Sequence, residues 1–498
     1  MVDTKEAPAH ILKRIGPTQL ILLVCVAALL ATAAVSFFAF EQLPHLEDEV
    51  AYLFQAKTLA LGRLTVPSPE YPEPFWTPFV LDHEGRRFGK YPPGWPAVLA
   101  GGVVAGAPWL VNPILAALAL YLVYRLGREW YDGWTGLLAA AFGLLSPLFL
   151  ILSGSFLSHL ASLVWLLLFS LWFIWTARGR HPVYAIGAGL ALGAAFLTRS
   201  LTAVAYAVPF VLYSLYQVVT RRQPHWRRYL LVAAAGGALA ALLPVYQWAV
   251  TGDPWLNPYV LWWPYDRIGF GPGIGAMPGG HSPFYAWVNL KQDLSRAATD
   301  LLGWPALEAL ARLGWPSDAG LRLLLGLTIG WLPLLLGLAL HPRRARDWAL
   351  AAPFACLVVA YLFYWIGSPA RLWGPRYYFE GFGGLWLLAA VGVRKAWVWA
   401  SAQERPAWLR PALAATLAVV TAVSLSVSLP PRLAEAHAFY GITRAQFEPI
   451  EEAELENALV IVYAKRWLEY GALLASMSPL LDDEVYYLYN GELSRTPP

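Results

Sequence analysis

The chain has 498 residues, of which 58% are hydrophobic and 14% charged, with a net charge of +4 and a mean hydropathy of +0.48. Soluble domains carry about 25% charged residues, so this composition excludes a water-soluble enzyme, a nucleic-acid-binding domain and a disordered chain. The apolar runs are continuous and rich in Leu and Ala, which indicates membrane-spanning helices rather than the alternating strands of a barrel. We therefore expect an all-α polytopic membrane protein.

About eleven transmembrane helices are predicted, since a span needs about 20 apolar residues. Residues 1–17 form a short N-terminal segment without a signal-cleavage site, so the first predicted helix is expected to stay uncleaved. The two cysteines, Cys25 and Cys356, lie in apolar runs and offer no disulfide framework. The spans are predicted at residues 18–39, 107–124, 135–152, 158–176, 183–197, 201–218, 229–249, 321–340, 348–366, 379–393 and 411–429.

The basic residues orient these spans. With the N-terminus in the cytoplasm, the short inner segments hold 18 of the 36 Lys and Arg residues and a net charge of +12, whereas the rest of the chain has −8. Lys and Arg on short loops mark the cytoplasmic side. We expect a multi-pass protein of a bacterial-type inner (cytoplasmic) membrane, with the C-terminus and the active site outside.

Three segments outside the membrane are too long to be simple turns: residues 41–106, 250–320 and 430–498. The first opens with helical spacing and the second is dense in Gly, Pro and aromatic residues. The third contains ALVIVYA and VYYLYN, which are rich in strand formers and predict a small C-terminal α/β appendage. Loops on a rigid helical scaffold can carry polar chemistry, so function is expected in these segments.

Three consecutive carboxylates, Glu47, Asp48 and Glu49, follow the first predicted span. In a helix that begins here, Asp48, Tyr52 and Gln55 share one face. Acidic residues also stabilise a helix N-terminus, and that is the plainer interpretation. Placing three carboxylates beside a bilayer carries a larger desolvation cost than helix capping alone would justify, which favours a functional role.

The pattern Asp48-Glu49-x-x-Tyr52 after a first span, followed by KYPPG at residues 90–94, resembles the polyprenyl-phosphate-sugar-dependent glycosyltransferases of the GT-C fold. It is most similar to the branch of protein O-mannosyltransferases and lipid A aminoarabinose transferases, over residues 15–430. The resemblance implies a GT-C module at residues 18–429 and a lipid-linked sugar donor. It also implies inverting hexosyl or pentosyl transfer to a glycan, lipid or protein, with Asp48 as the catalytic base beside Glu49.

Positive charge is needed near a leaving phosphate. The resemblance places Lys90 at the donor phosphate, and the Arg376-Tyr377 pair resembles the family's late donor-phosphate contact. Arg199 lies between two predicted spans at their outer ends and is the third candidate. The alternatives are a snorkelling arginine at Arg199 and an interfacial aromatic belt around Arg376 and Tyr377.

The remaining candidates for the substrate pocket are Tyr52, His159, Asp266 and His281. His159 departs from the family, which tends to carry an acidic residue in this region; it either orients a substrate, bonds to Asp48, or is an ordinary interfacial histidine. Asp266 and His281 suit a flexible lid, although a Gly-rich loop is more often only a loop. A divalent ion held by His45, Glu47, Asp48 and His159 is a further alternative, but no motif fixes a metal geometry, so a metal is possible and not predicted.

Two other classes of function compete with a glycosyltransferase. A transporter or flippase of lipid-linked saccharides would show paired repeats and charges at mid-membrane, whereas the ionisable residues here gather at the outer boundary. A non-catalytic scaffold would leave the charges at the outer boundary unexplained. The basic residues serve orientation, so no nucleic-acid partner is expected.

Overall fold

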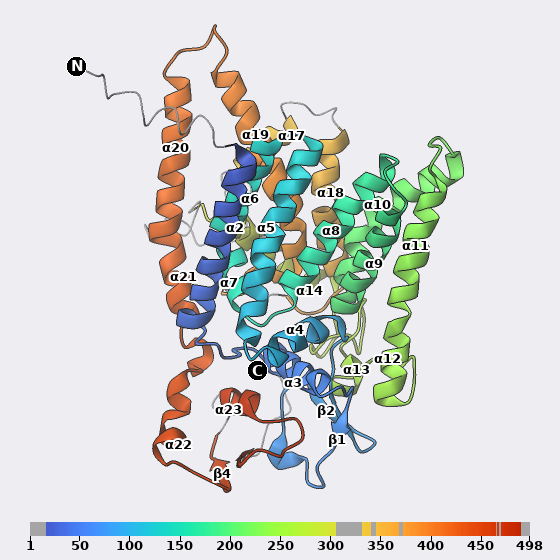
Figure 1. The fold of residues 1–498 in the computed structure, drawn as a ribbon, viewed down its shortest axis with the longest axis vertical. Helices are drawn as coiled ribbons and strands as arrows, with labels where there is room; N and C mark the ends of the chain where they lie inside the picture. The colour runs from blue at the N-terminus through green and yellow to red at the C-terminus, as the bar shows by residue number, and fades with distance from the viewer. Residues whose placement is uncertain are drawn as a thin grey trace, which may run out of the picture.

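The computed structural model of the chain is a bundle of helices with small sheets at one end (Figure 1). It describes residues 16–304, 331–339, 345–367, 372–464, 466–467 and 470–489. The bundle is formed by α2 (Pro17–Ala34), α5 (Val111–Trp130), α6 (Gly133–Leu145), α7 (Pro147–Gly154), α8 (His159–Ala177), α9 (Val183–Thr198), α10 (Ser200–Thr220), α11 (Arg227–Ala240), α12 (Leu242–Thr251), α14 (Pro283–Asp300), α17 (Leu332–Ala339), α18 (Ala345–Tyr361), α19 (Phe382–Ala400), α20 (Leu409–Val423) and α21 (Leu429–Ala436).

Six helical stretches of the described residues have the length and hydropathy of a membrane span. A seventh would be added if α6 and α7, which meet at an angle of 67°, were one span. The six are Pro17–Ala39, Pro108–Trp130, His159–Ala177, Ser200–Thr220, Arg227–Thr251 and Leu409–Glu452. These stretches confirm a polytopic helical membrane protein.

The predicted count of eleven spans is not reproduced by this test. The apolar run at residues 135–152 is bent because Ser146 caps a new helix through its hydroxyl, which accepts from the Phe149 amide, and Pro147 occupies the first helical turn. The predicted span at 183–197 is a helix of only 16 residues, and most of residues 321–340 lie outside the described residues.

The polar elements gather at one end of the bundle, the lower end in Figure 1. They include α3 (Glu47–Ala60) and an antiparallel sheet of order β1-β3-β2, and the apolar helix α4 (Gly94–Val104) and the short helix α13 (Pro258–Trp262) lie beside them. The strands of the sheet are β1 (Val66–Pro67), β2 (Val80–His83) and β3 (Arg86–Gly89). We call this the α3 end.

The predicted C-terminal α/β appendage is present at the α3 end. Its strands β4 (Ala458–Val462) and β5 (Val485–Tyr489) pair in parallel, and α23 (Gly471–Ser476) lies between them in the chain. A short helix, α22 (Glu448–Glu452), precedes β4. The parallel pairing requires a crossover connection, which the segment containing α23 supplies.

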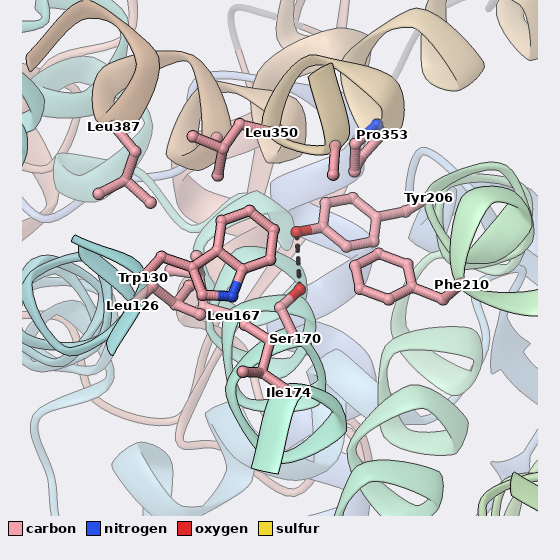
Figure 2. A pocket seen from close by; sticks show the side chains of 12 residues that line it. Leu126, Trp130, Leu167, Ser170, Ile174, Tyr206, Phe210, Leu350, Pro353 and Leu387 are labelled. Atoms are coloured by element: carbon pink, nitrogen blue, oxygen red, sulfur yellow. Dashed lines mark hydrogen bonds between the residues drawn. The ribbon is translucent and has the colours of Figure 1, made fainter. Parts of the chain in front are cut away.

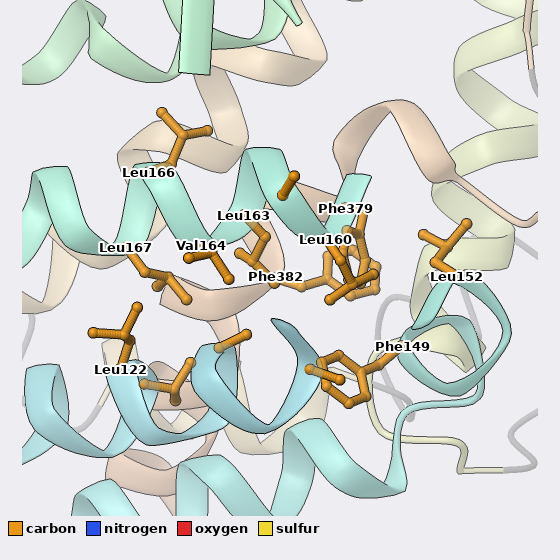
Figure 3. Close-up of a cluster of buried hydrophobic side chains, with 14 of the residues drawn as sticks. Leu122, Phe149, Leu152, Leu160, Leu163, Val164, Leu166, Leu167, Phe379 and Phe382 are labelled. Carbon is orange, nitrogen blue, oxygen red and sulfur yellow. The ribbon is translucent and has the colours of Figure 1, made fainter. Parts of the chain in front are cut away.

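The core of the bundle is built by long aliphatic and aromatic side chains of α5, α7, α8 and α19 (Figure 3). Leu163 and Leu167 of α8 are fully buried, as is Phe382 at the start of α19. Elsewhere small residues allow closer contact: a Cβ on Gly189 of α9 would lie 2.4 Å from the Val232 carbonyl oxygen of α11. In a lipid bilayer the hydrophobic effect does not drive helices together, so close packing of this kind stabilises their association.

Candidate functional site

Asp48 lies in the first turn of α3, with Glu47 and Glu49 on either side, where the helix dipole favours negative charge. The Tyr91 hydroxyl donates a hydrogen bond to Asp48 Oδ1, and Arg376 Nη1 lies 3.3 Å from Asp48 Oδ2. The side chain of Asp48 is 22% exposed. Asp48 is therefore an accessible carboxylate that a phenol and a guanidinium hold in place.

Glu49 points away from Asp48 and is a backbone clamp. Its Oε2 accepts the amides of His45 and Leu46, at 2.7 and 3.0 Å, and its Oε1 accepts the amide of Phe156 at 2.7 Å. Burial raises the pKa of Glu49 to about 7, although the three amides oppose this shift. Both oxygens are thus occupied by backbone amides, and Glu49 joins the start of α3 to the segment between α7 and α8.

Lys90 lies in a cage of aromatic rings. Its Nζ is 3.4 Å from the ring centroid of Phe79, 4.7 Å from that of Trp263 and 4.9 Å from that of Tyr259. The nearest carboxylate oxygen, Asp266 Oδ2, is 3.9 Å away, too far for a hydrogen bond. Burial lowers the pKa of Lys90 to about 8. Within the described residues its ammonium makes ring contacts and one distant ion pair but no hydrogen bond, so its donors are free for an anion.

The KYPPG segment brings Lys90 toward the junction of α9 and α10. A Cβ on Gly94 would lie 2.6 Å from the Leu197 carbonyl carbon, so only glycine allows this approach. Trp95, the next residue, donates to the Phe156 carbonyl at 2.8 Å. The motif therefore joins the first long segment to the bundle close to Arg199.

Arg199 lies at the α9–α10 junction. Its Nε is 3.1 Å from Oε1 of Glu380, and its Nη2 donates to the Tyr361 hydroxyl at 3.3 Å. Glu380 is fully buried on a short 3₁₀ helix, η5 (Arg376–Gly381). This contact joins α9, α10 and α18 to the turn that precedes α19.

Arg376 and Tyr377 begin η5. Arg376 Nη2 donates to the Tyr377 hydroxyl at 3.4 Å, while Nη1 faces Asp48. The Tyr377 ring stacks on that of Tyr361, with centroids 5.0 Å apart. Because Tyr361 also bonds to Arg199, these contacts connect Asp48, Arg376, Tyr377 and Arg199 in one cluster.

Tyr52 and His159 border this cluster. Tyr52 lies one helical turn after Asp48, 4.4 Å from the Tyr91 ring, and shares a hydrogen bond with Ser158 at 3.2 Å. His159 begins α8 and is buried, and within the described residues neither ring nitrogen has a hydrogen-bond partner. His159 therefore makes no hydrogen bond to Asp48 in this structure.

Asp266 and His281 differ in their relation to the cluster. Asp266 Oδ1 accepts from Trp365 Nε1 at 3.0 Å and from the Tyr364 hydroxyl at 3.3 Å, and its Oδ2 faces Lys90. His281 instead bonds through Nε2 to the Leu362 carbonyl at 2.9 Å. Both side chains are buried, so they are packed parts of the second long segment and do not form an open lid.

Sequence reasoning missed Tyr91, Tyr361 and Glu380. Tyr91 directly follows Lys90 within KYPPG, and Glu380 stands four residues after Arg376 in RYYFE, so both carried a local signal. Tyr361 carried none, because a tyrosine near the end of an apolar run is ordinary.

Two further features bear on what the site can hold. Within the described residues, no group of three or more His, Cys, Asp or Glu side chains is placed to bind a metal ion. A separate apolar pocket lies inside the bundle between α5, α8, α10, α18 and α19, where Ser170 and Tyr206 share a hydrogen bond of 3.0 Å (Figure 2). It is lined by no charged side chain, in contrast to the cluster around Asp48.

Comparison with known proteins agrees with this architecture. The family described as dolichyl-phosphate-mannose-protein mannosyltransferase matches residues 99–248. No curated protein sequence matches the chain. The crystal structure of ArnT from Cupriavidus metallidurans bound to undecaprenyl phosphate is similar, with a TM-score of 0.55 and 14% identity, over 95% of this chain and 86% of that one.

The oligosaccharyltransferase AglB from Archaeoglobus fulgidus, in complex with an inhibitory peptide and a dolichol-phosphate, is also similar. Its TM-score is 0.52 at 15% identity, over 94% of this chain but only 64% of that chain. ArnT and AglB are GT-C glycosyltransferases. The expected GT-C fold is therefore confirmed.

Proposed function

We propose that the protein is an integral membrane glycosyltransferase that transfers a hexose or pentose from a polyprenyl phosphate to an acceptor outside the cytoplasmic membrane. The GT-C fold supports this function, and so do the neighbours that were solved with undecaprenyl phosphate or dolichol-phosphate. A fold alone hosts many activities, so the proposal depends on the cluster around Asp48.

The donor phosphate binds between Lys90, Arg199 and Arg376. The observation that carries the proposal is the Lys90 ammonium, which is buried among aromatic rings and makes no hydrogen bond within the described residues. A buried ammonium without hydrogen bonds is costly unless an anion supplies them. Arg376 offers a planar guanidinium on the opposite side of Asp48 from Tyr91, and such a group suits phosphate oxygens.

Asp48 is the general base. The acceptor hydroxyl or amine attacks the anomeric carbon, its proton passes to Asp48, and the bond between that carbon and the phosphate oxygen breaks with its electron pair staying on the phosphate. The cations stabilise the charge that develops there, so no general acid is required. A single displacement inverts the anomeric centre.

The contacts of Asp48 also favour an order of binding. In the free protein Arg376 and Tyr91 both hold the Asp48 carboxylate. A donor phosphate competes for Arg376, which withdraws one positive contact from Asp48 and makes it a stronger base. The donor therefore binds before the acceptor is deprotonated.

Replacement of the base tests the assignment. Asp48→Asn keeps the size of the side chain and its contact with Tyr91 but removes proton acceptance, and we expect transfer to fall by at least about a hundredfold. The measurement is transfer of radiolabel from polyprenyl-phosphate sugars to membrane extract by the purified variant. Exposed Asp253→Asn is the matched control. Retained activity in a folded Asp48→Asn protein would exclude Asp48 as the base.

A further inference from the structure

Each cation of the site faces a carboxylate, but the three carboxylates differ in accessibility. Asp48, opposite Arg376, is 22% exposed at its side chain. The two others are closed off: the side chain of Asp266 opposite Lys90 is 2% exposed, and that of Glu380 opposite Arg199 is not exposed at all. Only Asp48 can reach a substrate, so the two buried carboxylates need another explanation.

Glu380 lies beside the Nε edge of Arg199 as an ion pair, with its Oε1 3.1 Å from Nε. The hydrogen bonds of the guanidinium go elsewhere, from Nε to Thr202 Oγ1 at 3.3 Å and from Nη2 to the Tyr361 hydroxyl at 3.3 Å. In the described part of the chain, Nη1 of Arg199 has no hydrogen-bond partner. The arginine is thus held rigidly, with part of its charge offset and one nitrogen left for a ligand.

Asp266 occupies the corresponding position beside Lys90. Trp365 and Tyr364 both donate to Oδ1, which fixes the carboxylate, and Oδ2 is left 3.9 Å from the ammonium. Asp266 Oδ2 is buried and has no hydrogen-bond partner in the described residues. The carboxylate therefore offsets the charge of Lys90 without using the ammonium's hydrogen-bond donors.

The charge of the lipid phosphate changes during the reaction that we propose for this site. A sugar-linked phosphodiester carries one negative charge. The released phosphomonoester carries more than one at neutral pH, because its second pKa is about 6. Cations without counter-charges would bind the product more tightly than the donor and delay its release.

We propose that Glu380 and Asp266 are positioning residues that offset the charges of Arg199 and Lys90 and so weaken binding of the product lipid phosphate relative to the donor. This inference rests on the proposed function. Glu380 and Asp266 each offset the charge of the cation beside them and so limit the affinity of the site for a doubly charged phosphate. Removal of either carboxylate leaves a net positive charge beside the bound lipid.

Direct binding tests this without knowledge of the donor sugar. The full-length protein in lipid nanodiscs is titrated with undecaprenyl phosphate, a monoester, and with its methyl ester, a diester with a single charge. Glu380→Gln and Asp266→Asn are each expected to bind the monoester more tightly, on the order of tenfold, from one unit charge in a partly solvated site. The affinity for the diester should rise by a smaller factor.

The matched control is Asp132→Asn. Asp132 is also paired with an arginine, Arg394, but it lies at the far end of the bundle, and asparagine can keep its cap on α6. The Asp132→Asn variant should bind both lipids as tightly as the wild type does. If the carboxylate only supports the fold, its replacement would weaken the binding of both lipids or leave the binding of both unchanged.

The outcomes separate the two proposals. If the wild type does not bind undecaprenyl phosphate, or if Lys90→Met does not weaken its binding, the proposed function fails and this inference fails with it. If the wild type binds and folded Glu380→Gln and Asp266→Asn bind the monoester no more tightly, only the inference is overturned. Should Glu380→Gln not fold, Asp266→Asn decides the result.

Discussion

At the scale of single residues, the state of the Lys90 side chain sets a pH dependence. Burial lowers its pKa to about 8, so the ammonium is charged below pH 8 and loses its charge as the pH rises through 8. We expect kcat/KM for the donor to fall between pH 7 and pH 9, because this ratio reports groups of the free enzyme. The arginine of Lys90→Arg should keep its positive charge over this pH range, so the decline of kcat/KM should flatten.

Lys57 provides the control for this measurement. Its pKa is also lowered to about 8 by burial, but its Nζ bonds to the carbonyls of α23 and not to the cluster. Lys57→Arg should therefore retain the decline. A profile that stays flat in the wild type, or that Lys57→Arg abolishes, would contradict the role of Lys90.

The sequence was informative about residues that belong to a motif and silent about their partners. Asp48 and Lys90 were predicted as site residues because they stand in short patterns of defined order. Glu380 lies close to Arg376 in RYYFE, but its pairing with Arg199, which is 181 positions earlier, arises only where the α9–α10 junction meets η5. Glu49 faces away from Asp48 because adjacent residues on a helix point about 100° apart.

At the scale of elements, the attachment of α3 depends on Glu49. Glu49→Ala would leave the amides of His45, Leu46 and Phe156 buried without an acceptor, and we expect a loss of at least about 3 kcal/mol of stability, since hydrogen bonds to a charged group contribute about 1.5–3 kcal/mol each. Thermal unfolding of the purified protein measures this loss.

Glu70→Ala, at an exposed position of the same long segment, should leave the unfolding temperature unchanged. Glu49→Gln keeps one acceptor oxygen and should lie between the wild type and Glu49→Ala. Equal stability of Glu49→Ala and the wild type would show that the three amides do not depend on this carboxylate.

Helices with clear periodicity were predictable, and bends and short strands were not. Helical spacing after residue 46 predicted α3, and strand formers predicted β4 and β5. Hydropathy measures only apolar length, so it merged α6 and α7, although Ser146 followed by Pro147 is a readable helix start. The sheet β1-β3-β2 was missed because β1 has two residues, one of them proline.

At the scale of the whole molecule, the polar segments and the short basic loops lie at opposite ends of the bundle (Figure 1). We expect the α3 end to face the outside. Glu70→Cys at this end should react with a membrane-impermeant maleimide in intact cells, and Gln403→Cys, in the exposed turn between α19 and α20, only after permeabilisation. Labelling in the reverse order would invert the proposed topology.

Composition and charge were sufficient to predict a helical membrane protein, and the motif order to predict the GT-C fold. The position of the C-terminal appendage was not predictable from either, since it depends on tertiary contacts such as that of Lys57 with the end of α23. Contacts between segments so far apart in sequence leave no periodic signal in either partner.

The helix that carries Asp48 is held by residues that are synthesised near the end of translation. His45 bonds to the carbonyl of Ile442, which is 397 positions later, and Lys57 bonds to carbonyls more than 400 positions later. At about 5–20 residues per second, α3 waits roughly 20–80 s for these partners. The emerging chain therefore inserts its helices before α3 and Asp48 have these late contacts. Chains whose synthesis stops before residue 442 would lack these contacts to α3.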